Sequence, residues 1–426
     1  MEGNKVIFAS REDLKFRFFR VVEKTHHNNT REDNVSVDLL MGSLPMSMEE
    51  EMAREAHGLL MLTSQSRWLD PATESIIVSR APVRMDFGGW PDTQFFLKYD
   101  WGYLMNIALR LWTYVVIVQS RRPGGYVYHA LDFKEQIHER EETFVHQALE
   151  ELRSQLSTRE RSIIIHSLAP PQTGLGTSGS VGVAVVAALN AVKCGKTMTV
   201  EEIVYLAHMI EWLRMESETG IQDQIAAGDG SSVIRCLARK FPQSRWRRLR
   251  FLPGMRQRTE SSSFLIDTAE VRSSDEEHRR KIRMVERGGS ARRNVLDSIR
   301  QIRRWGMRAA KSFESGSFED FCTCVGKIWQ AQVQLDPSAR TERIMKLEEA
   351  AKEMEAVVKW LGAAGGGMGV VLCPRGAGQR REVETELEKL VQTMSGARII
   401  PCLVATTGVE VCSFTPEELE EVITRR

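Results

Sequence analysis

Residues 162–192 read SIIIHSLAPPQTGLGTSGSVGVAVVAALNAV, and this stretch decides the class of fold that the sequence predicts. The apolar run that ends near Ser167 predicts a β-strand, and the alanine- and valine-rich run from Thr177 predicts a helix. Between them lies the loop 170–176, whose glycines let the backbone pass close to a ligand. The N–H groups and dipole at the start of a helix attract anions. The stretch therefore predicts a polyphosphate-binding loop.

The loop differs from the two best-known nucleotide patterns. No Gly-Lys-Ser/Thr follows it, which excludes a Walker loop, and Gly174 and Gly176 lack the third glycine of a dinucleotide fingerprint. Hydroxyls from Thr177, Ser178 and Ser180 come next. A serine in this first turn is also a suitable Mg²⁺ ligand. The alternative without a ligand is a capped helix after a glycine turn.

The rest of the chain predicts a mixed α/β protein. A chain of 426 residues is too long for one ordinary core. From Ser75 onward, short β-rich runs alternate with helical patterns. The order of predicted strands and helices changes again near residue 245. We expect an N-terminal extension over 1–74, a first domain over 75–245 and a second over 246–426. Within the extension, 46–62 has the pattern of an amphipathic helix.

The composition of the chain limits the kinds of partner that it is expected to bind. The net charge of +1 argues against a chain-wide nucleic-acid or membrane surface, and no apolar run reaches the roughly 20 residues of a membrane span. The seven cysteines are scattered, so we expect reduced thiols in a cytoplasmic protein. The arginine-rich stretch 279–311 has apolar residues at helical spacing, which predicts a solvated helix face. A polyanionic or acidic partner is the alternative.

Residues 80–93, RAPVRMDFGGWPDT, have the composition of a sugar pocket. A sugar presents neutral hydroxyls, so its site needs carboxylates that accept hydrogen bonds and an aromatic wall beside the ring. Asp86, Trp90 and Asp92 supply these groups next to Gly88 and Gly89. The alternative is a strand followed by a polar turn.

Residues 201–230, EEIVYLAHMIEWLRMESETGIQDQIAAGDG, predict a helix with a carboxylate at the edge of its buried face. The buried stripe at helical spacing comprises Ile203, Leu206, Ala207, Ile210 and Leu213. Glu211 lies at the edge of this stripe. The helix is expected to break at 219–220, and Gln222, Asp223 and Gln224 follow in or after the turn.

Taken together, these segments resemble the galactokinase–homoserine kinase–mevalonate kinase–phosphomevalonate kinase (GHMP) superfamily. The loop P-x-x-x-G-L-G-T-S resembles its second motif, with Gly179 where alanine or serine is usual. Residues 80–93 resemble the first motif in its fucokinase form, although one residue shorter. The run LGAAGGGMG at 361–369 resembles the third, with Ala364 and Met368 as departures. The Q-D-Q variant resembles the fucokinase and heptose kinase branches, and FLIDTAEVRSSD at 264–275 resembles a further strand and turn.

The resemblance implies a two-domain α/β (α+β) fold, with an N-terminal α/β domain, a ferredoxin-like C-terminal domain and the active site between them. It implies a sugar kinase that uses ATP and Mg²⁺, with Asp223 as general base and Arg84 paired with it. Ser178 and Glu211 would ligate Mg²⁺, with Glu216 and Glu218 as competitors for the glutamate role. The implied nucleotide contacts are Pro171, Gly174, Leu175, Gly176, Thr177, Ser178, Gly179, Ser180, Gly365, Gly366 and Gly367. The implied sugar contacts are Asp86, Gly89, Trp90, Asp92 and Gln222.

Three functions remain open from the sequence. The first is an L-fucokinase-like enzyme that phosphorylates the anomeric hydroxyl, which the tryptophan of GGWPDT favours. The second is a heptose-phosphate kinase, which shares the Q-D-Q feature. The third is a protein of this fold that binds a sugar or nucleotide as a regulator without turnover. The departures from the motifs favour this last reading, and the retained Ser178, Glu211, Asp223 and Arg84 oppose it.

Overall fold

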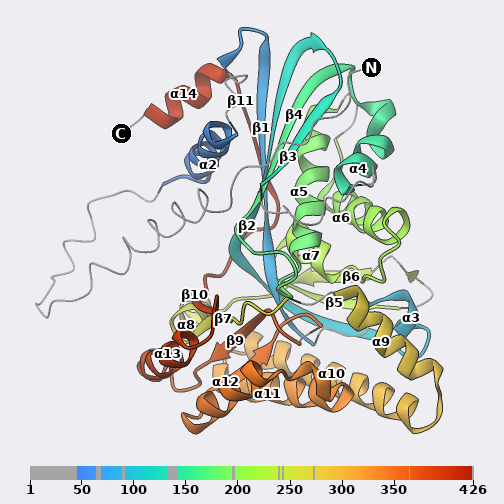
Figure 1. Ribbon diagram of the computed structural model, residues 1–426, viewed down its shortest axis with the longest axis vertical. Helices are drawn as coiled ribbons and strands as arrows, with labels where there is room; N and C mark the ends of the chain where they lie inside the picture. Colours follow the sequence, from blue (N-terminus) through green and yellow to red (C-terminus); the bar gives the residue numbers. More distant parts are fainter. Residues whose placement is uncertain are drawn as a thin grey trace, which may run out of the picture.

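The structure is a computed structural model that describes residues 46–63, 69–88, 92–131, 143–193, 197–237, 240–241, 244–271, 274–363 and 365–424. The expectations for 1–45 and for Gly89, Trp90 and Ala364 lie outside these residues. Helices surround two β-sheets, so the mixed α/β class expected from the sequence is confirmed (Figure 1). No described helix has the length and apolar character that crossing a membrane requires.

The first sheet stands upright in Figure 1 and has seven strands, in the order β11-β1-β2-β4-β3, with β5 against β2 and β6 against β5. Every pairing is antiparallel except that of β3 with β4. The strands are β1 (Thr73–Phe87), β2 (Gly102–Pro123), β3 (Tyr126–Ala130), β4 (Arg159–Ser167), β5 (Ser232–Cys236), β6 (Ser244–Arg248) and β11 (Glu410–Phe414). Although β11 comes from the far end of the chain, it pairs with β1 along the sheet edge.

Helices cover both faces of this sheet because its strands are apolar on both sides. Along β2, Val115 and Ile117 pack with the helices on one face, whereas Val116 and Val118 pack with those on the other. The first face carries α4 (Phe144–Leu152), α5 (Thr177–Val192), α6 (Val200–Met209) and α7 (Gln222–Asp229). The second face carries α2 (Met48–Leu62) and α14 (Pro416–Thr424). The helix expected over 46–62 is therefore confirmed as α2.

The second sheet has four antiparallel strands in the order β10-β7-β9-β8. They are β7 (Ser263–Asp267), β8 (Val357–Trp360), β9 (Met368–Leu372) and β10 (Arg398–Pro401). The helices of this half are α8 (Met255–Ser261), α9 (Ser274–Glu286), α10 (Gly289–Glu314), α11 (Phe318–Leu335), α12 (Glu342–Glu353) and α13 (Ala377–Gln392). One apolar core joins the sheets, since Ile107 of the first and Val370 of the second belong to the same buried cluster as Ile302 of α10.

The arginine-rich stretch forms helices as expected. Val295, Ile299, Ile302 and Gly306 of α10 are buried along one side. The arginines between them are exposed or half-buried. Several are held by neighbours; Arg303, for example, pairs with Asp100 at 2.7 Å. The predicted solvated face is therefore confirmed, and a polyanionic partner stays a hypothesis.

Candidate active site

The predicted phosphate loop connects β4 to α5, which begins at Thr177 as the sequence indicates. Gly174 and Gly176 have φ values of 81° and 74°, a conformation that favours glycine. Gly176 immediately precedes the helix, whose first-turn N–H groups have no acceptor within the helix itself. The buried Leu175 fixes the loop, because its carbonyl accepts a hydrogen bond from the N–H of Arg84 at 2.9 Å.

The three hydroxyl residues of the loop have different environments. Thr177 donates its hydroxyl to the Pro170 carbonyl at 3.2 Å, and the buried Ser180 donates to the Ala81 carbonyl at 2.8 Å. The N–H of Ser180 is also used within the helix. Ser180 therefore holds α5 against β1 and leaves no group for a phosphate, contrary to the role that the resemblance implies. Ser178 is exposed, so its hydroxyl is accessible to a ligand.

Glu211 lies opposite Ser178, on a π-helical turn (η4, Ile210–Arg214) that continues α6. Its carboxylate is hydrogen-bonded by the Ser178 hydroxyl and by the side-chain amide of Gln224. Burial raises the pKa of Glu211 to about 7; the hydrogen bond from Ser178 opposes this shift, and the nearby Asp223 adds to it. A carboxylate with this environment is stabilised in its charged form by a cation.

The π-helical turn changes one expectation from the sequence. Leu213 was expected in the buried stripe but is 51% exposed. The wider turn rotates the residues after Ile210 away from the α-helical register, and such turns often occur at functional sites. Of the two competing glutamates, Glu216 is exposed in the following loop and Glu218 is half-buried there. It is Glu211 that contacts Ser178.

Asp223 is in the first turn of α7 and contacts both the loop and an arginine. Nε of Arg84 donates to Oδ1 of Asp223 at 2.9 Å, and the second guanidinium nitrogen lies 2.7 Å from the same oxygen. Arg84 is almost fully buried and also donates to the Gly174 carbonyl. A Cβ added to Gly176 would lie 2.9 Å from the Asp223 carboxyl carbon. The arrangement holds one partly accessible carboxylate against the N-terminus of α5.

Asp92 lies beside the same helix. Its Oδ2 accepts a hydrogen bond from the N–H of Gln222 at 3.1 Å. Burial raises the pKa of Asp92 to about 7, and the neighbouring Asp223 adds to the shift. The side-chain Oε1 of Gln222 is buried without a hydrogen-bond partner among the described residues. Buried polar atoms are normally paired, so this oxygen is a candidate acceptor for a ligand hydroxyl.

Asp86 has an environment that the sequence did not indicate. Its Oδ2 lies 2.9 Å from Nζ of Lys359, and its Oδ1 accepts the N–H of Gly362 at 2.7 Å. Arg84 is 3.8 Å away. Both oxygens are thus occupied, and the side chain is 1% exposed. Asp86 is therefore engaged within the protein, and its expected contact with a sugar stays a prediction.

The glycine run 361–369 packs directly on the phosphate loop. The N–H of Met368 donates to the Thr173 carbonyl at 2.8 Å. A Cβ on Gly174 would lie 2.4 Å from the Leu361 carbonyl oxygen, and one on Gly367 would lie 2.6 Å from that of Thr173. Gly365, Gly366 and Gly367 all have positive φ, which suits glycine. The departure Met368 is buried at the start of β9 and leaves this contact intact.

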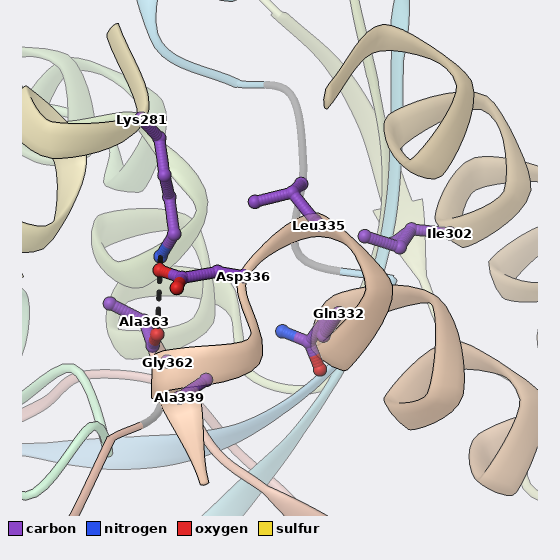
Figure 2. Close-up of a pocket in the computed structure, with 8 residues that line it drawn as sticks. All are labelled: Lys281, Ile302, Gln332, Leu335, Asp336, Ala339, Gly362 and Ala363. Carbon is purple, nitrogen blue, oxygen red and sulfur yellow. Dashed lines mark hydrogen bonds and ion pairs between the residues drawn. The ribbon is translucent and has the colours of Figure 1, made fainter. Parts of the chain in front are cut away.

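A small cavity lies beside this run, lined by residues of α9, α10 and α11 (Figure 2). Its volume is about 10 Å³, close to the minimum for one water molecule. Nζ of Lys281 points into it and donates to the Ala363 carbonyl at 3.3 Å. Asp336 lies 3.9 Å from the same nitrogen, and Oε1 of Gln332 has no partner among the described residues. Burial lowers the pKa of Lys281 to about 8.

The oxygens of Ser178 and Glu211 fit a Mg²⁺ ion in part. A hard cation prefers carboxylate and hydroxyl ligands, and Mg²⁺ in phosphate sites keeps waters and substrate oxygens as well. Within the described residues, no group of three or more His, Cys, Asp or Glu side chains is arranged to hold a metal. A two-ligand protein site completed by phosphates and water agrees with both observations.

Reasoning from the sequence missed Lys359, Gln224 and Lys281. Lys359 had a local signal: it is one charge between Val358 and Trp360, next to a glycine run. A charged residue inside a short apolar strand needs a buried partner. Gln224 is adjacent to the predicted base, but its contact with Glu211 depends on how α6 and α7 pack.

Comparisons with known proteins give a family match for one segment and similar folds for most of the chain. Residues 143–231 match the family model "GHMP kinases N terminal domain". This matched segment contains the phosphate loop, Glu211 and Asp223. No curated protein matches the sequence significantly. Many solved structures match the fold.

Three of these solved structures show the range of kinases whose folds are similar to this one. A D-glycero-D-manno-heptose 1-phosphate kinase from Bacteriodes thetaiotaomicron has 18% identity and a TM-score of 0.58, over 79% of this chain and 98% of that one. Lactococcus lactis galactokinase complexed with galactose has 14% identity and a TM-score of 0.61, over 82% and 98%. Streptococcus pneumoniae phosphomevalonate kinase has 15% identity and a TM-score of 0.60, over 78% and 100%. The chain therefore shares the mixed α/β fold of these solved GHMP kinases, and residues 143–231 match the model of the GHMP kinase N-terminal domain.

Proposed function

We propose that the protein is an ATP-dependent kinase that phosphorylates a sugar hydroxyl. One observation carries the proposal: the carboxylate of Asp223 is paired with Arg84 and packs against Gly176 at the N-terminus of α5. A phosphate-binding helix end and a carboxylate in contact with it are two of the parts used in phosphoryl transfer to a hydroxyl. The match of residues 143–231 to the GHMP kinase N-terminal domain supports the same reading.

In the proposed mechanism, the N–H groups at the start of α5 bind the phosphates of ATP. Asp223 accepts the proton of the attacking hydroxyl through its carboxylate, and Arg84 keeps that carboxylate oriented. Ser178 and Glu211 would hold Mg²⁺, which would neutralise charge on the phosphates when bound. Solvent access to Asp223 is limited, because its side chain is 19% exposed.

We further propose that the acceptor is an unphosphorylated monosaccharide, bound by Asp92 and Gln222. Sequence motif 80–93 supports a fucokinase-like sugar and the anomeric hydroxyl. Arg84, which contacts Asp223, and Lys359, which contacts Asp86, are each paired with an aspartate. Neither is free to bind a substrate phosphate, which favours a neutral sugar over a heptose phosphate.

The test is ATP consumption against a panel of free monosaccharides and sugar phosphates, with the product hydroxyl identified by NMR. Wild type should respond to a free sugar, and Asp223→Asn should lose roughly 10²- to 10⁴-fold in kcat, the usual contribution of a general base. Asp229→Asn, on the same helix but paired with Arg248, is the matched control and should retain activity. Response only to sugar phosphates would select the heptose-phosphate alternative. No turnover with any acceptor would leave the regulator without catalysis as the function.

A further inference from the structure

Two basic and two acidic side chains alternate along one line of contacts. Lys359 lies 2.9 Å from Asp86, Asp86 lies 3.8 Å from Arg84, and Arg84 lies 2.7 Å from Asp223. Lys359 is on β8 of the second sheet, whereas Asp86 and Arg84 are on β1 of the first. The line therefore runs from the second sheet to the candidate base.

Burial makes each of these charges dependent on its neighbour. Lys359 is 0% exposed, Asp86 1% and Arg84 4%. An ion removed from water is stable only where an opposite charge compensates it closely. Burial alone would raise the pKa of Asp86, yet that pKa lies below its usual range because of Lys359 first and Arg84 second. Burial lowers the pKa of Lys359, and the charge of Asp86 opposes that shift, so the 2.9 Å contact is what favours the charged ammonium. Lys359 is thus the principal cation for Asp86.

Arg84 faces two carboxylates and is shared unequally between them. Two of its nitrogens contact Asp223, at 2.9 Å and 2.7 Å, while its distance to Asp86 is 3.8 Å. The near ammonium of Lys359 satisfies Asp86, so Arg84 remains with Asp223. If Lys359 loses its charge, the buried Asp86 has Arg84 as its closest cation, and the attraction between them is strong in this poorly solvated region.

We propose that Lys359 is a positioning residue, which acts through Asp86 to keep Arg84 on the candidate base Asp223. The proposal rests on the kinase function proposed above. It assigns to the strand before the glycine run a role in the chemical step, in addition to its place in the second sheet. Asp86 connects Lys359 to the glycine run as well, since it also accepts the N–H of Gly362.

The proposal predicts an unusual pattern of kinetics for charge-removing variants. Lys359→Met should lower kcat roughly 10- to 100-fold, because small displacements of catalytic groups have effects of this size. The KM for ATP should change less than about threefold, since Asp86 still holds Gly362. Adding Asp86→Asn to this variant should restore kcat at least about fivefold, because no buried carboxylate then competes for Arg84. A purely structural role predicts instead that the two substitutions are additive in their damage.

Two further variants complete the kinetic experiment. Lys359→Gln keeps a donor for Asp86 but no charge, and it should show the same loss of kcat if Lys359→Met does not fold. Lys346→Met removes an exposed lysine paired with Glu342 and should keep wild-type kcat. Thermal melts establish that each variant is folded. Absence of rescue in the double variant, or additive losses, would overturn the proposal.

A crystal structure of Lys359→Met tests the same idea without turnover. The expected result is that the Arg84 guanidinium leaves hydrogen-bonding distance of Asp223 and moves toward Asp86, and that Asp86→Asn reverses the movement. An unchanged pairing of Arg84 with Asp223 would refute the role of Lys359. This outcome is distinct from failure of the kinase proposal, which is decided by turnover of the wild-type protein.

Discussion

Gly179 and Asp223 are in direct contact where α5 crosses α7: a Cβ on Gly179 would lie 2.6 Å from the Cβ of Asp223 and 3.0 Å from its backbone carbonyl carbon. Only glycine allows this approach of the two helices. Gly179 occupies the position where the GHMP pattern usually has alanine or serine. The departure thus coincides with the closest packing of the candidate base against the phosphate loop.

Gly179→Ala should therefore move Asp223 and reduce activity. We expect kcat to fall roughly 10- to 100-fold, with a loss of unfolding free energy of about 1–3 kcal/mol from overpacking. Steady-state kinetics and chemical denaturation measure the two effects. Gly378→Ala, on α13 with no neighbouring atom in the way, is the control and should raise stability by about 0.4–1 kcal/mol. Equal kcat and stability in the two variants would contradict the prediction, because α5 and α7 could then move apart without loss of activity.

Asp92→Asn should change how stability depends on pH. The folded-state pKa of Asp92 is about 7, above the ordinary value of 3.8, chiefly because of burial. Its contribution to stability is complete below the unfolded pKa and is lost as pH rises through the folded one. Between about pH 4 and 7, wild type should lose on the order of 1.4 kcal/mol per pH unit relative to the variant. Urea denaturation across this range measures the difference, and parallel profiles would contradict the assignment.

Glu211→Gln should weaken the dependence of activity on Mg²⁺. Loss of the carboxylate leaves Ser178 as one of the proposed protein ligands, so the Mg²⁺ concentration for half-maximal activity should rise at least roughly tenfold. Ser178→Ala should give a smaller shift in the same direction. The competing glutamate supplies the control: Glu216 is exposed, and Glu216→Gln should match wild type. A shift with Glu216→Gln instead would move the metal role to that residue.

Lys281→Met should loosen the glycine run. Nζ of Lys281 donates to the Ala363 carbonyl at 3.3 Å. We expect the KM for ATP to rise about threefold or more, with a smaller change in kcat, because binding rather than the chemical step is affected. Lys389→Met removes an exposed lysine on α13 and serves as the control. A selective fall in kcat would instead connect Lys281 with catalysis.

Local patterns were sufficient for much of the site. The start of α5 at Thr177 follows from the glycines of the loop and the apolar run after it, which act within a few residues. Asp223 was expected in or after a turn, and the structure places it in the first turn of α7. The contact of Ser178 with Glu211 matches the pairing that the GHMP resemblance implies. Arg84 and Asp223 also meet as that resemblance implies, across 139 positions. Their chemical roles are the proposals tested above.

The remaining features depend on contacts that no local pattern contains. Asp86 was expected to face a sugar, but its partner Lys359 is 273 positions away and takes one of its oxygens. Leu213 was expected to be buried, but the π-helical turn rotates it outward. The pairing of β11 with β1 could not be predicted either, because the sequence of a five-residue strand does not specify which strand it pairs with.

That last pairing has a consequence for the growing chain. On the ribosome, β1 is made early, but Glu410 and the rest of β11 follow some 330 positions later. Until then the edge of β1 presents unpaired N–H and C=O groups, including those near Arg80. An edge left open during synthesis is a site where other chains can add. β11 thus closes this edge of the sheet only after most of the described chain has been synthesised.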